Sequence, residues 1–240
     1  MKPLVITETI SEITEDCIKR AFSNSVVITK ISELSKVNDI LDKENPKRKI
    51  YFYGSNCHSI MTLIPFEALY SNFKIIKGSC LTLSKVQQMK FLDDKIPEIL
   101  LPHTYLDEQK VLEPGIEDTK IDCTSDMVVV DKIDVVKTWV CLGYTTNGSM
   151  VSKVTGNLEG DYADPDAKFV PISRTSDESR KFEAIVKKII AEFGLSGIFE
   201  LVMIEDKNDD LWYYETRFRP TEHIADFFER GLINFIKANI

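Results

Sequence analysis

The sequence predicts an α/β protein in which a domain of βαβ units precedes a second domain that contains hairpins. Between residues 3 and 80, short β-branched or aromatic runs alternate with helical patterns, which is typical of a parallel sheet. Hairpin patterns follow at residues 127–156 and 199–220. With 240 residues, 43% of them hydrophobic and 28% charged, the chain suffices for one large or two small globular domains.

The first domain is predicted to contain four strands in order. They are "PLVIT", "SVVITKI", "KIYFYG" and "FKIIKG", and the amphipathic helices "SEITEDCIKRAFSN" and "SELSKVNDILDKE" separate the first three. Gly54, Ser55 and Asn56 follow the third strand at its carboxyl end, where open α/β sheets bind ligands. A plain strand-to-helix turn explains the same three residues.

The second domain begins with a helical pattern near residue 85, which Pro97 brings to an end. Residues 107–125 are polar and without periodicity, and they predict a short lid or loop. Asn147-Gly148 then lies between two alternating runs and predicts a tight hairpin turn. A long amphipathic helix should end at Gly194, the position of a C-terminal cap. The pattern "EHIADFFERGLINFIKANI" predicts a final helix.

Charge and cysteine usage narrow the class of protein further. A net charge of −8 argues against nucleic acid or an anionic membrane as a partner. We expect a cytoplasmic protein, because no segment has the pattern of a secretory signal or of a membrane span. The five cysteines are scattered without CxxC spacing and are expected to be reduced thiols.

The hairpin "FELVMIEDKNDDLWYYETRFRP" carries Glu200 and Glu215 where apolar residues are expected. A turn centred on residues 207 and 208 would place these two glutamates directly opposite each other. Opposed like charges destabilise a sheet, so the pair needs a cation or a shared proton. A Mg²⁺ ion that also binds substrate phosphate would supply one. The alternative is a solvated face on which each glutamate pairs with an arginine.

The end of the chain resembles that of the ATP-grasp family. A helix, Gly194, "GLSGIFELVMI", a turn and "LWYYETRFRP" follow each other in the family's order, and "YETRFRPTEH" is similar to its "NEIAPRPH" ending. By this resemblance, Glu200 and Glu215 are the two acids that hold Mg²⁺–ATP. The resemblance also implies that Arg217 and Arg219 neutralise the transferred phosphate.

Other segments extend the resemblance over nearly the whole chain. "MVVVDKI" resembles the family's hinge strand, which implies that Val130, Asp131 and Ile133 contact the adenosine. The implied organisation is a Rossmann-like pre-ATP-grasp domain at residues 1–80 and a compact ATP-grasp domain at residues 81–240. The latter would have a shortened lid at residues 107–125.

One position and one segment depart from the family pattern. Arg217 stands where the family usually has an asparagine that binds the metal, and the lid segment leaves little room for the usual lysine strand and glycine-rich loop. Lys132, Lys137 and Lys153 are the candidate cations for that missing lysine, and Lys153 is preferred. All three can also be explained as exposed strand lysines.

The resemblance implies a carboxylate–amine ligase with ATP and Mg²⁺ as cofactors. Its partners would be a small-molecule or peptide carboxylate and an amine or amino-acid acceptor, and a homodimer is compatible with it. Two alternatives remain open. One is a catalytically inactive nucleotide-binding or interaction module, and the other is an ATP-independent α/β protein whose hairpin acids are surface pairs.

Overall fold

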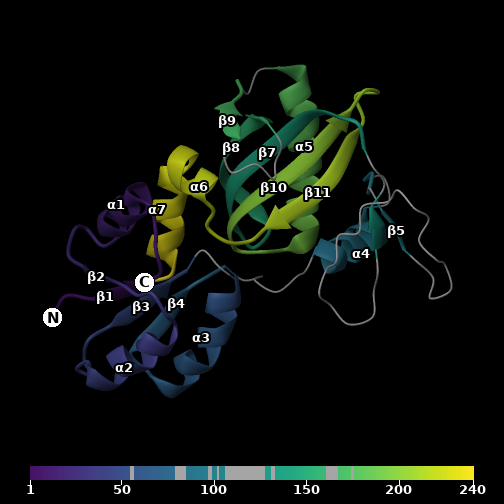
Figure 1. Ribbon diagram of the computed structural model, residues 1–240. Helices are drawn as coiled ribbons and strands as arrows, with labels where there is room; N and C mark the ends of the chain where they lie inside the picture. The colour runs from purple at the N-terminus through teal and green to yellow at the C-terminus, as the bar shows by residue number, and fades with distance from the viewer. Residues whose placement is uncertain are drawn as a thin grey trace.

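The protein folds into a parallel sheet and a larger antiparallel sheet, each covered by helices (Figure 1). The structure, a computed structural model, describes residues 1–54, 57–78, 85–96, 99–101, 103–105, 128–130, 133–160, 167–173 and 176–240. The predicted α/β class is confirmed. No helix in these described ranges has the length and hydropathy needed to cross a bilayer.

The parallel sheet has the strand order β2-β1-β3-β4 and contains the four strands predicted for the first 80 residues. The strands are β1 (Leu4–Thr7), β2 (Val27–Lys30), β3 (Ile50–Tyr53) and β4 (Phe73–Ile76). Helices α1 (Glu12–Ala21), α2 (Ser35–Lys43) and α3 (Cys57–Leu69) connect them. Leu4 and Ile6 pack with α2 and α3, whereas Val5 faces α1, so β1 is buried on both sides.

The antiparallel sheet has the order β11-β10-β7-β8-β9. Its strands are β7 (Val135–Thr146), β8 (Ser149–Glu159), β9 (Lys168–Pro171), β10 (Gly197–Asp206) and β11 (Leu211–Arg217). The Asn147-Gly148 turn is confirmed, with φ of 49° and 73° at these two residues. Helix α5 (Asp177–Phe193) covers one face of the sheet and ends at Gly194, whose φ of 61° suits glycine.

A smaller unit lies beside β11. Helix α4 (Lys85–Lys95) packs on β11, and β5 (His103–Tyr105) pairs antiparallel with β6 (Val128–Val130). The lid predicted at residues 107–125 lies between these two strands and outside the described residues. It stays a prediction.

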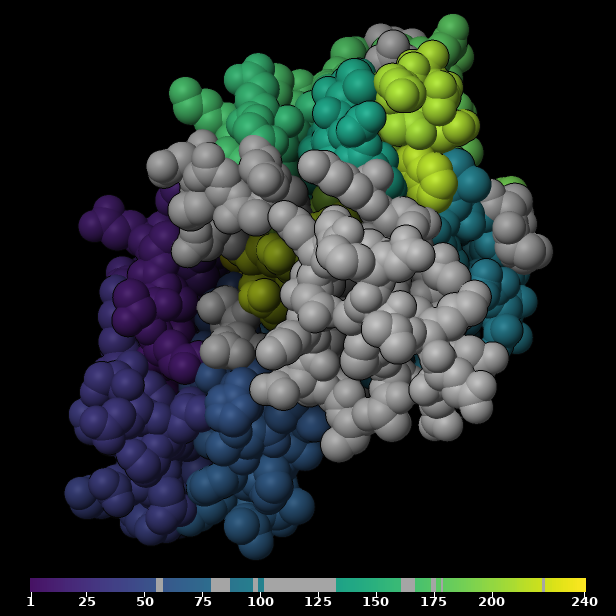
Figure 2. Space-filling model, turned by 45° about the vertical axis from the view of Figure 1, so that its right-hand side comes forward, coloured from purple at the N-terminus to yellow at the C-terminus, as the bar shows by residue number. Residues whose placement is uncertain are grey.

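The final helical pattern forms two helices, α6 (Glu222–Phe227) and α7 (Glu229–Ala238), where one was expected. The chain leaves helical geometry at Phe228, whose φ is −136°. Helix α7 packs on α1, and one apolar cluster joins these helices to both sheets. The predicted domain boundary near residue 80 lies outside the described residues and stays a prediction. In Figure 2, the first domain (purple to blue) gathers at the lower left and the antiparallel sheet at the top.

Candidate functional site: an acid pair on the antiparallel sheet

The acidic hairpin is formed by β10 and β11, but its register differs from the expected one. Glu200 lies opposite Arg217, and Val202 lies opposite Glu215. The expectation that Glu200 faces Glu215 directly is wrong. Two shifts of one residue each give this register. The turn is centred one half-residue later than expected, so that Glu205 pairs with Leu211, and β11 has one extra residue, Tyr214, in a β-bulge between the residues that pair with Val202 and Met203.

The bulge decides which face of the sheet carries Glu215. Tyr213 pairs with Met203 and is fully buried on the face covered by α5. In a regular strand, Glu215, two positions after Tyr213, would point to the same face as Tyr213. The extra residue instead places Glu215 and Arg217 on the opposite face, together with Glu200 and Val202. We call this the acid face.

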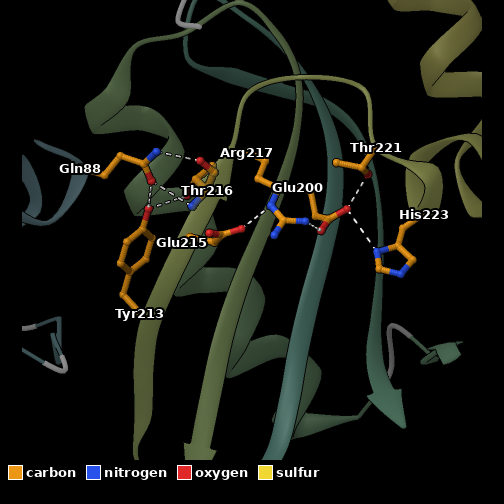
Figure 3. Close-up of polar contacts among 8 residues, drawn as sticks. All are labelled: Gln88, Glu200, Tyr213, Glu215, Thr216, Arg217, Thr221 and His223. Carbon is orange, nitrogen blue, oxygen red and sulfur yellow. Dashed lines mark hydrogen bonds and ion pairs between the residues drawn. The ribbon is translucent and has the colours of Figure 1, made fainter. Parts of the chain in front are cut away.

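Glu200 is fully buried, and polar groups of Thr221, His223 and Arg217 lie against it on the acid face (Figure 3). Thr221 donates its hydroxyl to Oε2 of Glu200 at 2.5 Å, and Nδ1 of His223 lies 3.3 Å from the same oxygen. On the other side, Nη1 of Arg217 lies 3.7 Å from Oε1.

These contacts set the ionisation of Glu200. Burial by itself raises the pKa of this carboxyl, but the hydrogen bonds from His223 and Thr221 and the charges of His223 and Arg217 outweigh it. The net pKa lies below the usual value, so Glu200 is a carboxylate at neutral pH. The pKa of His223 is raised in turn, chiefly by its hydrogen bond to Glu200.

Arg217 joins the two glutamates. Its Nε forms an ion pair with Oε1 of Glu215, while its Nη1 faces Glu200. One guanidinium therefore offsets the repulsion between two carboxylates. The alternative of a solvated Glu–Arg face accounts for the arginine, but it does not account for Glu200, which is 0% exposed.

The two carboxylates fit a divalent ion only in part. Mg²⁺ in proteins often takes one or two carboxylates and completes its octahedron with water and substrate phosphate oxygens. Among the described residues, no group of three or more histidine, cysteine or acidic side chains is placed to hold a metal. The acid pair therefore fits Mg²⁺ together with ligand phosphates, and with Arg217 displaced from between the acids.

A pocket of about 500 Å³ adjoins the acid face. Val202, the residue opposite Glu215, lines it together with Ile204, Tyr214 and residues 135–138 and 158–160. Both apolar and polar groups are present, as is usual for small-molecule sites. The pocket thus lies on the acid face, next to the residue that is opposite Glu215.

The predicted hinge residues lie close to this pocket in the sequence. Val130 ends β6, Ile133 is two residues before the pocket-lining strand segment, and Asp131 lies outside the described residues. Arg219 lies between β11 and α6.

The preferred lysine is not brought to the acids. Lys153 forms an ion pair with Glu183 of α5, on the face opposite the acid face. Of the two other candidates, Lys137 borders the pocket, but its Nζ lies 4.4 Å from the ring centroid of Trp139 on the α5 face. Lys132 lies outside the described residues.

Sequence reasoning missed Thr221 and His223. Their signal was the ending "RPTEH", since a histidine also closes the "NEIAPRPH" pattern that the segment resembles. It missed Gln88 as well, and no local pattern marks that residue.

Comparisons with known proteins find relatives in structure alone. No family profile and no curated protein sequence matches this chain. The D-alanine–D-alanine ligase of Bacillus anthracis complexed with ATP is similar with a TM-score of 0.61 and 13% identity, over 100% of this chain and 96% of that one. The N5-carboxyaminoimidazole synthetase of Staphylococcus aureus has a TM-score of 0.60 and 13% identity, over 98% and 77%. The multifunctional pyruvate carboxylase of Rhizobium etli has a TM-score of 0.64 and 10% identity, over 100% of this chain and 28% of that one.

Proposed function

Because the chain has the ATP-grasp fold, we propose that it is an ATP-dependent carboxylate–amine ligase that acts through an acyl phosphate. The observation that carries the proposal is the placement of Glu200 and Glu215 on one face of the sheet, beside a pocket of about 500 Å³. The similar structures support the reaction class, since their names describe a ligase, a synthetase and a carboxylase.

The pocket is proposed to take the adenosine of ATP. Its volume is within the usual range of about 300–1,000 Å³ for small-molecule sites. Val202 and Ile204 provide an apolar surface for a base, and residues 135–138 border it. The hinge roles of Val130, Asp131 and Ile133 belong to the same proposal, because the chain runs from β6 through these residues into the pocket-lining part of β7.

The phosphates are proposed to extend from the pocket toward the acid pair. Glu200 and Glu215 would hold Mg²⁺, which when bound supplies positive charge to the phosphate oxygens. Arg217 and Arg219 would bind phosphate oxygens, for which a planar guanidinium is well suited. For the additional cation, Lys137 borders the pocket whereas Lys153 does not, and the Lys137 ammonium, which lies over Trp139, would have to turn toward the phosphates.

In the proposed reaction, the substrate carboxylate attacks the γ-phosphorus and ADP leaves, which gives an acyl phosphate. The amine then attacks the acyl carbon, phosphate leaves, and the amine gives up a proton. Positioning and charge neutralisation dominate such phosphoryl transfer. The chain's own residues therefore bind and orient, and Glu200 is held in place for that role by Thr221 and His223.

The first test is calorimetric binding of Mg²⁺–ATP to the wild type, to Glu215→Gln and to Glu192→Gln. Glu192 is exposed on α5 and serves as the matched control. We expect Glu215→Gln to abolish Mg²⁺-dependent binding with its fold intact, and Glu192→Gln to bind as the wild type does. Equal Mg²⁺–ATP binding by both variants would show that the acid pair is not part of the nucleotide site.

The second test separates a ligase from an inactive nucleotide-binding module. The inactive module is favoured by Arg217, which stands where the family usually has an asparagine. ADP release is measured in single turnovers with panels of carboxylates and amines. A ligase releases ADP only with a matching carboxylate, whereas an inactive module binds Mg²⁺–ATP and releases none with any member of the panel.

A further inference from the structure

The β11 bulge is held from outside the sheet by a buried network of polar groups. The hydroxyl of Tyr213 donates to Oε1 of Gln88 at 2.5 Å and lies 2.9 Å from the hydroxyl of Thr216 (Figure 3). Residues three apart in a regular strand point to opposite faces. The contact between Tyr213 and Thr216 on one face exists because the bulge lies between them.

Gln88 also satisfies the backbone of Thr216. Its Nε2 donates to the Thr216 carbonyl at 2.8 Å, and the Thr216 N–H donates to Oε1 at 2.9 Å. Strand β11 is at the edge of the sheet, so these two groups face away from β10 and have no strand partner. The side-chain amide of Gln88 thus takes the place of a neighbouring strand at one residue.

That residue is the one between Glu215 and Arg217. Fixing both backbone groups of Thr216 fixes the direction in which its two neighbours leave the strand, and both leave toward the acid face. Gln88 is 5% exposed and belongs to α4, so the network also ties α4 to the acid pair.

We propose that Gln88 is a positioning residue for the acid pair. It locks the β11 bulge through Tyr213 and Thr216, and so holds Glu215 and Arg217 on the face that carries Glu200. The effect on nucleotide binding rests on the proposed function, whereas the effect on Arg217 does not.

The test compares Gln88→Met with Gln87→Met. Methionine keeps the length of glutamine and removes its hydrogen bonds, and Gln87 is the exposed neighbour on the same helix. In the ligand-free protein, the NMR signal of the Arg217 Nε–H, which is paired with Glu215, is expected to shift and broaden in Gln88→Met alone. Calorimetry is expected to show Mg²⁺–ATP binding about 10- to 100-fold weaker in Gln88→Met, as for other residues that orient metal ligands.

Tyr213→Phe is the second variant and decides the question if Gln88→Met does not fold. It removes only the hydroxyl between Gln88 and Thr216. We expect a smaller shift of the Arg217 Nε–H signal and a smaller loss of Mg²⁺–ATP affinity than in Gln88→Met. A folded Gln88→Met, or in its absence Tyr213→Phe, with the wild-type Arg217 signal overturns the positioning role. If the wild type itself does not bind Mg²⁺–ATP, the proposed function fails, and the Arg217 signal still decides the role of Gln88.

Discussion

Replacing Arg217 by methionine should destabilise the ligand-free protein and strengthen its binding of Mg²⁺. At 3.7 Å and an effective dielectric constant of about 20, the attraction between Arg217 and Glu200 is about 4.5 kcal/mol. Solvent screens part of this because the arginine side chain is 34% exposed, and ordering the side chain offsets more. Since Glu200 keeps its bonds to Thr221 and His223, we expect a net loss of about 1–3 kcal/mol in the free energy of unfolding.

Urea denaturation without ligand and calorimetry with Mg²⁺ alone measure the two effects. Arg180→Met is the matched control, because Arg180 lies at the same 3.7 Å from Asp177 but both side chains are exposed. The control should show no measurable change in either quantity. If Arg217→Met also leaves stability and Mg²⁺ affinity unchanged, Arg217 does not act as the counter-ion of the acid pair.

Three further predictions concern the rest of the fold. Ion pairs with two lysines lower the pKa of Glu15 to about 2. The ionised Glu15 therefore stabilises the folded state above pH 4.5, the usual pKa of the group, and this stabilisation is lost as pH falls toward 2. Glu15→Gln should therefore cost about 0–1 kcal/mol at pH 7, and denaturation curves of the two proteins should converge near pH 2. Gly197→Ala, whose Cβ would meet the Gly78 Cα at 2.8 Å, should lower the melting temperature more than Gly194→Ala, which meets nothing within 4 Å. Burial raises the pKa of Cys17 to about 11, so a thiol reagent at pH 8 should modify it only after unfolding.

Features with a local cause could be predicted from the sequence. The Asn147-Gly148 turn and the Gly194 helix end depend on which residues tolerate positive φ, and that property is visible in the residue itself. The alternation of strands and helices in the first 80 residues likewise follows from short hydrophobic patterns.

The register of the acidic hairpin could not be predicted in the same way. The run "LWYYETR" can form a regular strand or a bulged one, and the bulge is held by Gln88, which is 125 positions from Tyr213 in the sequence. The partners of Glu200 were missed for a similar reason, because Thr221 and His223 reach it only when α6 packs back against the sheet. The two glutamates within apolar runs are visible in the sequence, whereas the contacts around them required the tertiary structure.

The central claim is that the pocket beside the acid face holds the nucleotide, and one comparison of affinities tests it. Val136 lines this pocket and is 65% exposed, so Val136→Trp should fill the pocket at little cost to folding. Val151 is 57% exposed on β8 and does not line the pocket, which makes Val151→Trp the control. In calorimetric titrations with Mg²⁺–ATP, we expect Val136→Trp to bind at least about tenfold more weakly than the wild type, a loss of about 1.4 kcal/mol, and Val151→Trp to bind equally well. Equal affinity in all three proteins, or no binding by the wild type, would contradict the account.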